Sequence, residues 1–77
     1  MNSQPLIDMA ATGNNIDRLR RKAGLSVRDI QQAVGFNTPQ AIYKWLHGAS
    51  LPQIDNLIIL ASLLNVTLDD LIVCSKK

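Results

Sequence analysis

Gln40, Tyr43, Lys44 and His47 lie at helical spacing within eight residues, and all four side chains carry hydrogen-bonding groups. An amide presents a paired donor and acceptor to adenine, a lysine ammonium donates to guanine or phosphate, and Tyr and His donate or stack. No carboxylate interrupts this set. Side chains of this kind are typical of a surface that contacts base edges in the DNA major groove, which is wide enough to admit a helix. A solvated polar face of an ordinary surface helix has the same composition, so the neighbouring elements decide between the two interpretations.

The sequence predicts a short helix that begins at Thr38 and Pro39 and carries these side chains. Thr38 is a good N-cap, and proline is tolerated in a helix only in the first turn. Gly35 offers the left-handed residue that ends a preceding helix, so only two residues separate Gly35 from Thr38. This is the arrangement of a helix-turn-helix. The polar residues are left on the free face of the second helix, because its core face is expected to contain Ile42, Trp45 and Leu46.

Two helices are expected before this turn. The first starts between residues 8 and 14, ends at Gly24, and has an apolar face made of Ile16, Leu19 and Ala23. The second starts at Ser26, because Ser26 and Asp29 have the spacing of a capping box. Its buried stripe is expected to contain Ile30, Ala33 and Val34.

Two further helices are expected after it. One runs from about Gln53 to Leu64, ends at Asn65 in the left-handed conformation, and buries Ile54, Leu57, Leu60, Ala61 and Leu64. The last covers residues 67–73, with Thr67 as its cap. Apolar residues recur at three- and four-residue spacing and do not alternate, so no strand is expected. The prediction is an all-α fold, a compact five-helix bundle in one small domain.

The charged residues are unevenly distributed along the chain. Residues 16–48 contain six basic and two acidic side chains, a net charge of +4, whereas residues 49–75 contain three acidic side chains and no basic one. The formal net charge of +2 therefore hides a basic first half and an acidic second half. This polarity indicates that one end of the domain approaches a polyanion, although solvated helix faces would also produce it.

Several other classes of protein are disfavoured. The lone Cys74 cannot form an intrachain disulfide and lacks the partners of a zinc site, which favours a reducing, cytoplasmic setting. The apolar stretch at residues 57–64 is too short to span a membrane. Ser26 and Ser50 are better explained as capping and loop residues than as nucleophiles, so we expect neither an enzyme nor a cofactor or metal.

From residue 16 to residue 73 the chain resembles the lambda-repressor-like helix-turn-helix regulators, the Cro/repressor or xenobiotic-response-element type. The resemblance rests on LR at 19–20, GLS at 24–26, IYKW at 42–45, LP at 51–52, DNLIILA at 55–61 and LDDL at 68–71. It implies a five-helix domain whose third helix, at about residues 39–47, enters the major groove. It also implies a repressor that binds double-stranded DNA as a homodimer on a palindromic operator. From the expected helix positions, the chain consists of a flexible N-terminal arm over residues 1–7, the DNA-binding domain over residues 8–74 and a tail over residues 75–77.

The resemblance also implies roles for individual residues. Base contacts fall to Gln40, Tyr43 and Lys44, and phosphate contacts to Arg20, Arg28, Asn37, Thr38 and His47. In the family a glutamate at the end of the third helix often pairs with the arginine that Arg20 matches. Leu46 stands at that position here, so Arg20 is expected to be freer for phosphate. Val27 replaces the usual phosphate-binding glutamine, and the segment from Gly35 to Ile42 is one residue longer than the commonest turn of the family.

The helix at 53–64 is apolar nearly all round, which favours some protein contact. We expect a dimer interface formed by Ile58, Ile59, Leu63, Ile72 and Val73, unless the last helix and the N-terminal arm cover this surface. Two alternatives remain on sequence alone. One is an antitoxin that uses the same fold, and the other is a protein-interaction module that does not bind DNA.

Overall fold

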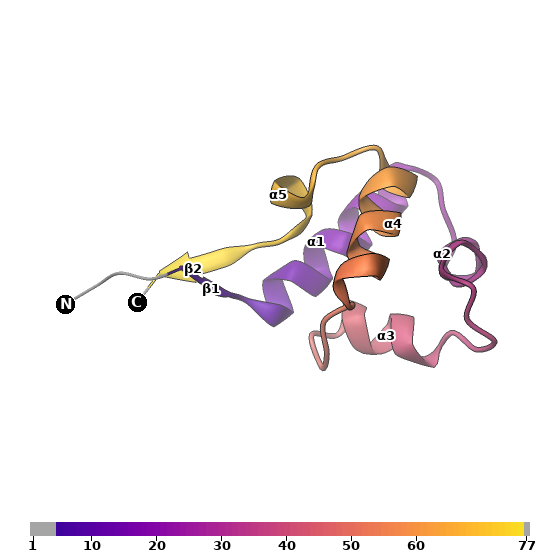
Figure 1. The fold of residues 1–77 in the computed structure, drawn as a ribbon, viewed down its shortest axis with the longest axis horizontal. Coiled ribbons are helices and arrows are strands. Elements are labelled where there is room, and N and C mark those ends of the chain that lie inside the picture. The colour runs from indigo at the N-terminus through magenta and orange to yellow at the C-terminus, as the bar shows by residue number, and fades with distance from the viewer. Residues whose placement is uncertain (1–4, 77) are drawn as a thin grey trace.

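Five helices and two short strands form residues 5–76, the part of the chain that this computed structural model describes. In chain order they are β1 (Pro5–Ile7), α1 (Met9–Lys22), α2 (Val27–Val34), α3 (Gln40–Leu46), α4 (Ile54–Leu64), α5 (Leu68–Leu71) and β2 (Cys74–Lys76). Figure 1 shows α3 at one end of the bundle, with the last turns of α1 and α4 together at the opposite end. The predicted all-α bundle is confirmed, with the two strands as its minor exception.

The predicted helix boundaries follow from local capping. Asp8 caps α1 by accepting a hydrogen bond from the Ala11 amide at 2.9 Å, and Gly24, with φ +73°, follows the helix. The capping box of α2 is complete, since Asp29 N–H donates to Ser26 and Ser26 N–H donates to Asp29. Gly35 ends α2 with φ +77°. Two later boundaries are confirmed in the same way. Asn65 ends α4 with φ 58°, and Thr67 begins α5 with a complete capping box.

One fully buried residue from each helix meets in the core. These residues are Ile16, Ile30, Ile42, Leu60 and Leu71, each at most 1% exposed. Burial of such a side chain contributes about 1.5–3 kcal/mol. Trp45, Leu46, Leu57 and Leu64 complete the buried cluster. All five helices are therefore held by shared side-chain packing, including α5, which is too short to be stable alone.

Residues 5–7 and 74–76 contradict the sequence prediction. They form an antiparallel ribbon in which Pro5 pairs with Lys76 and Ile7 pairs with Cys74. Only the expectation of no strand is therefore wrong, and the division of the chain into arm, domain and tail stays a prediction. The remainder of the expected arm, residues 1–4, lies outside the described residues. Strands of three residues are too short for alternation to be visible in the sequence.

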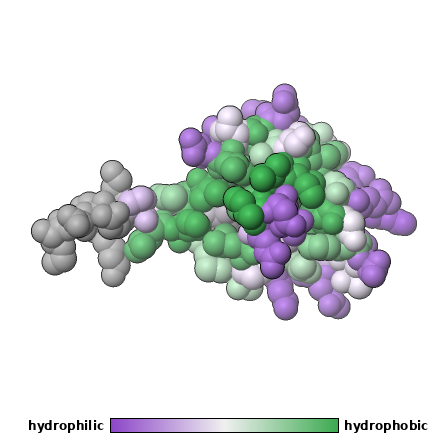
Figure 2. All heavy atoms as spheres, viewed as in Figure 1, coloured by the Kyte–Doolittle hydropathy of each residue, from purple (hydrophilic) through white to green (hydrophobic). Residues whose placement is uncertain are grey.

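Three side chains expected on buried helix faces lie at the surface. Ile54 is 64% exposed, and Ala23 and Ala33 are also exposed, because no element within residues 5–76 covers them. Ile58, one turn after Ile54, is 55% exposed. Figure 2 shows hydrophobic residues gathered at the surface over α4. The helix predicted for residues 67–73 is also shorter, since Ile72 has extended backbone with ψ 128°.

Thr12 attaches the C-terminal segment to α1. Its fully buried hydroxyl accepts a hydrogen bond from the Val73 amide at 3.0 Å and donates to the Val73 carbonyl at 3.3 Å. Nearby, the Asn15 side chain donates to the carbonyls of Asp70 and Leu71 at 2.7 and 3.0 Å. The α5 segment therefore depends on polar side chains of α1 as well as on Leu71.

We expect Thr12→Val to destabilise the protein by about 1–3 kcal/mol, because the buried Val73 amide loses its acceptor. Thr12→Ser is the matched control, since it keeps the hydroxyl and removes only a methyl group. Urea unfolding of the three proteins measures the difference. Equal midpoints for Thr12→Val and wild type would show that this attachment contributes nothing.

Candidate nucleic-acid interface

The exposed face of α3 carries the side chains that the sequence assigned to base contact. Gln40, Tyr43 and Lys44 are all exposed, and the Tyr43 ring is 47% accessible. On the opposite side of the same helix, Ile42 is fully buried and Trp45 is 5% exposed. The helix is therefore fixed by one face and offers amide, phenol and ammonium groups on the other.

Hydrogen bonds and an aromatic contact hold the turn before α3. The Gln31 carbonyl accepts hydrogen bonds from the Gly35 and Phe36 amides, and its side chain donates to the Phe36 carbonyl at 3.2 Å. The Phe36 ring then packs against Trp45, with ring centroids 5.7 Å apart. Gln31 closes the turn from within α2, a role that sequence analysis missed. These contacts fix the direction of α3 relative to α2.

The start of α3 differs from the prediction. Pro39 occupies the cap position with φ −86° and ψ 2°, and no side chain caps the helix. The first backbone bond joins the Tyr43 amide to the Pro39 carbonyl at 3.1 Å. Thr38 was expected as the cap and is not, because the helix begins one residue later than the proline rule suggested. Its hydroxyl is left outside the helix, and Thr38 and Asn37 are both exposed in the turn.

A hollow of about 210 Å³ lies between α1 and α3, beside the exposed face. Polar side chains from both helices line it, namely Asn14, Asp17, Arg20, Arg21, Tyr43 and His47. His47 follows the last turn of α3, and its ring lies 6.5 Å from that of Tyr43. The structure thus brings Tyr43 of α3 and His47, which caps its end, next to Arg20 and Arg21 of α1.

Arg20 is not free, which contradicts the expectation from the missing glutamate. Its guanidinium donates to the Asp17 carboxylate at 2.7 and 3.0 Å and to the Leu25 carbonyl at 2.8 Å, and the side chain is 15% exposed. Asp17 therefore replaces the glutamate as partner. Arg21 also donates to Asp17, at 2.9 Å, but is 72% exposed. Sequence analysis missed Asp17, although its spacing of three and four residues from the arginines is a recognised helical pairing.

The pKa of Asp17 is lowered, first by its hydrogen bond from Arg20 and further by the hydrogen bond from Arg21 and both positive charges. A carboxylate with a pKa below its usual 3.8 stabilises the fold fully above that value, and this contribution is lost as pH falls through the folded-state pKa. The pKa of Asp29 is lowered in the same direction by its hydrogen bonds with Ser26.

We expect Asp17→Asn to lower stability at pH 7 by about 1 kcal/mol, because the ion pairs are partly exposed. The cost should shrink as pH falls below the usual 3.8 and vanish below the lowered folded-state pKa, where the wild-type carboxylate is itself protonated. Thermal unfolding between pH 2 and 7 compares the two proteins. Parallel stability curves with a constant offset would mean that Asp17 has no lowered pKa.

The other basic and polar residues assigned to phosphate lie around α3. Arg28 is exposed in the first turn of α2, and His47 is exposed at the end of α3. With Asn37 and Thr38 in the turn, they stand on the elements that flank the exposed face. Of the expected phosphate contacts, only Arg20 is occupied by bonds within the described part of the protein.

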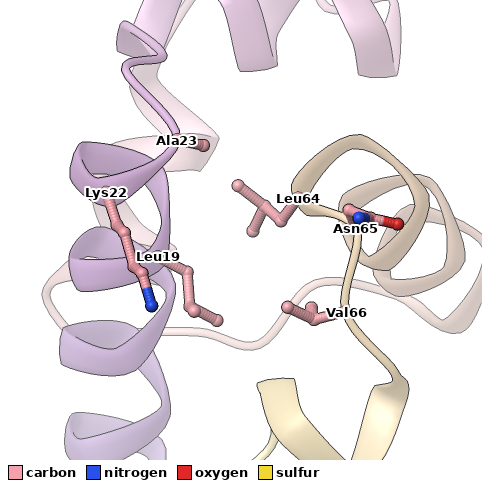
Figure 3. A pocket seen from close by; sticks show the side chains of 6 residues that line it. All are labelled: Leu19, Lys22, Ala23, Leu64, Asn65 and Val66. Atoms are coloured by element: carbon pink, nitrogen blue, oxygen red, sulfur yellow. The ribbon is translucent and has the colours of Figure 1, made fainter.

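A second hollow of about 320 Å³ lies between the last turn of α1 and the end of α4. Leu19, Leu64 and Val66 point toward one another across it, and Lys22 lies along its edge (Figure 3). Within the described residues, no three His, Cys, Asp or Glu side chains are grouped so that they could hold a metal ion. None of the helices in residues 5–76 combines the length and apolar composition that crossing a membrane requires.

The residues expected at a dimer interface differ in accessibility. Ile58 is exposed, whereas Ile59, Leu63, Ile72 and Val73 are half-buried. Leu63 and Ile72 pack against the core, so the free apolar surface of α4 is made mainly of Ile58 and the unexpected Ile54.

Comparison with known proteins agrees with this geometry. Residues 16–71 match the protein family described as helix-turn-helix. Among solved structures, the restriction-modification controller protein C.AhdI from Aeromonas hydrophila is similar, with a TM-score of 0.74 and 22% identity over 83% of this chain and 96% of that one. A transcriptional regulator from Listeria innocua has a TM-score of 0.72 and 22% identity, over 94% of this chain and 60% of that one. No curated protein matches the sequence.

Proposed function

We propose that this chain, which belongs to the helix-turn-helix family, is a DNA-binding transcriptional regulator whose α3 lies in the major groove and selects the sequence. The observation that carries the proposal is the exposed set Gln40, Tyr43 and Lys44 on a helix whose other face is buried. A helix held in this way presents its side chains without losing core contacts. Sequence selection by base-edge hydrogen bonds requires such fixed donors and acceptors.

Each of the three side chains has a distinct role in this proposal. The Gln40 amide pairs with adenine through one donor and one acceptor, and the Lys44 ammonium donates to guanine. Tyr43 lies between them on the same face and contacts a base or the adjoining backbone. Pro39, which has no donor to offer, sets where the helix starts.

Phosphate contacts are proposed for the residues around α3. Arg28, Asn37, Thr38 and His47 are exposed on the elements that flank it, and they would fix the register of the domain on the duplex. Arg20 acts differently, since Asp17 and Leu25 hold its guanidinium. We assign Arg20 mainly to positioning the corner between α1 and α2, and the neighbouring phosphate contact to the more exposed Arg21.

We further propose that the protein acts as a repressor and binds a palindromic operator as a homodimer. Two α3 helices related by a two-fold axis would enter successive major grooves about 34 Å apart on one side of the duplex. The apolar surface that includes Ile58 lies outside the face of α3 and would remain available for the partner while DNA is bound. The half-buried Ile59, Leu63, Ile72 and Val73 would border that contact.

Selection of random duplexes on purified Gln40→Ala tests the assignment of α3. We expect the variant to lose its preference at one base pair in each half-site, with a cost of about 1–3 kcal/mol at that position. Gln32→Ala is the control, because Gln32 is an exposed glutamine on α2. If Gln40→Ala selected the same sequence with unaltered base preferences, this face of α3 would not be the reading surface.

A further inference from the structure

The ribbon formed by β1 and β2 projects away from the helical bundle (Figure 1). Each strand pairs only with the other, so both outer edges of the ribbon are unpaired within the described residues. Leu6 and Ile7 on β1 are 45% and 48% exposed. Open edges with apolar side chains are normally covered in native proteins, and an isolated two-stranded ribbon is marginal in water.

A second unpartnered apolar surface lies on α4. Ile54 and Ile58 are one helical turn apart on the same side of the helix, and we call them the α4 strip. With Leu6 and Ile7 they account for four of the five large hydrophobic side chains that are exposed in residues 5–76. The fifth, Tyr43, belongs to the face of α3. Figure 2 shows hydrophobic residues over α4 and again toward the ribbon on the same viewed side.

The area that a stable dimer buries requires both surfaces. A standard interface covers about 800 Å² on each partner, which two isoleucines of one helix cannot provide. The ribbon supplies additional apolar area through Leu6 and Ile7.

We infer that the ribbon of one copy lies across the α4 strip of a second copy, whose ribbon returns the same contact. Such an interface is isologous, with each copy giving and receiving one ribbon. If the two-fold axis of this dimer runs toward the α3 end of the bundle, both α3 helices lie on the same side of the dimer. A palindromic operator requires this arrangement. This inference rests on the homodimer in the proposed function and names the surfaces that form it.

Cross-linking through the single native cysteine tests the inference. Cys74 is exposed on β2, opposite Ile7 in the ribbon. Wild-type protein is mixed with Ile58→Cys/Cys74→Ser, so each chain has one cysteine and any link from position 58 to position 74 joins two copies. A short bismaleimide is added without DNA, and the linked peptides are identified by mass spectrometry. Gln32→Cys/Cys74→Ser is the control, because Gln32 is exposed on α2.

We expect abundant links between positions 58 and 74 and few between positions 32 and 74. Links only between two Cys74 residues would place ribbon against ribbon, and links only between position 58 of two copies would place α4 against α4. Either result, or no covalent dimer, overturns the inference.

Sedimentation without DNA gives an independent measure. Leu6→Asp should raise the dimer dissociation constant roughly tenfold or more, with an unchanged helical spectrum, whereas Gln32→Asp should not change it. A monomeric wild-type chain at tens of micromolar, or a Leu6→Asp dimer as tight as wild type, contradicts the inference. Duplex selection tests the proposed function separately. A dimer that is linked through the ribbon but has no sequence preference would refute that function without contradicting the interface.

Discussion

Lys44→Glu is expected to lower DNA affinity by at least about 100-fold, because a carboxylate would replace an ammonium on the exposed face of α3. Like charges brought together at an interface cost several kcal/mol, and each 1.4 kcal/mol is a factor of ten in affinity. Both subunits of a dimer would carry the change. Titration of a selected duplex with each protein at two salt concentrations measures the loss of affinity and the part of it that is electrostatic.

Lys22→Glu is the matched control for this experiment. It makes the same change in formal charge, but Lys22 lies along the edge of the hollow between α1 and the end of α4 and is not part of the face of α3 (Figure 3). Exposed charges farther than about 8 Å from the DNA are largely screened at physiological ionic strength, so the control should lose much less affinity. Equal losses from the two variants would mean that overall charge, and not the face of α3, controls binding.

Gly13→Ala is expected to destabilise the protein by about 3 kcal/mol, which would lower its melting temperature by roughly 10–20 °C. A Cβ at position 13 would meet the backbone carbonyls of Trp45 and Leu46, and it would lie 2.7 Å from the Leu46 oxygen. Backbone atoms of α3 cannot move aside as a flexible side chain can. Gly13 is therefore a point at which the backbones of α1 and α3 approach closely, and the substitution would displace the DNA-facing helix.

The sign of the stability change in Gly13→Ala distinguishes two explanations. Helix propensity alone predicts that Gly→Ala within α1 stabilises by about 1 kcal/mol, so the two explanations give opposite results. Gly24→Ala is the control, because nothing lies within 4 Å of its added Cβ and only its φ of +73° opposes the change. That variant should lose about 1 kcal/mol. A Gly13→Ala protein more stable than wild type would contradict the proposed contact.

Local signals explain which parts of the fold could be predicted from the sequence. Ser26 with Asp29, Gly35, Asn65 and Thr67 act through atoms a few residues away, and the structure confirms all of these boundaries. The exposed positions of Gln40, Tyr43 and Lys44 also follow from helical periodicity once Ile42 and Trp45 are placed in the core. Their contacts with DNA remain predictions.

Long-range contacts explain what the sequence did not reveal. The pairing of Pro5 with Lys76 joins the two ends of the described chain, and three-residue strands have no pattern to detect. Ile54 fits the apolar period of α4, but none of the other elements in residues 5–76 covers it. The contact at Gly13 depends on the backbone carbonyls of α3, about thirty residues away, and no neighbouring residue in the sequence indicates it. By contrast, the pairing of Arg20 with Asp17 could have been read from their spacing.

Methylation interference on a selected duplex tests most directly whether α3 occupies the major groove. Guanine N7 lies in the major groove, and adenine N3 lies in the minor groove. We predict that N7 methylation blocks binding at guanines in two half-sites whose centres are about 10 base pairs apart, and that Lys44→Glu weakens binding to the same unmethylated duplex. Interference from adenine N3 methylation alone, or from neither modification, would contradict the account.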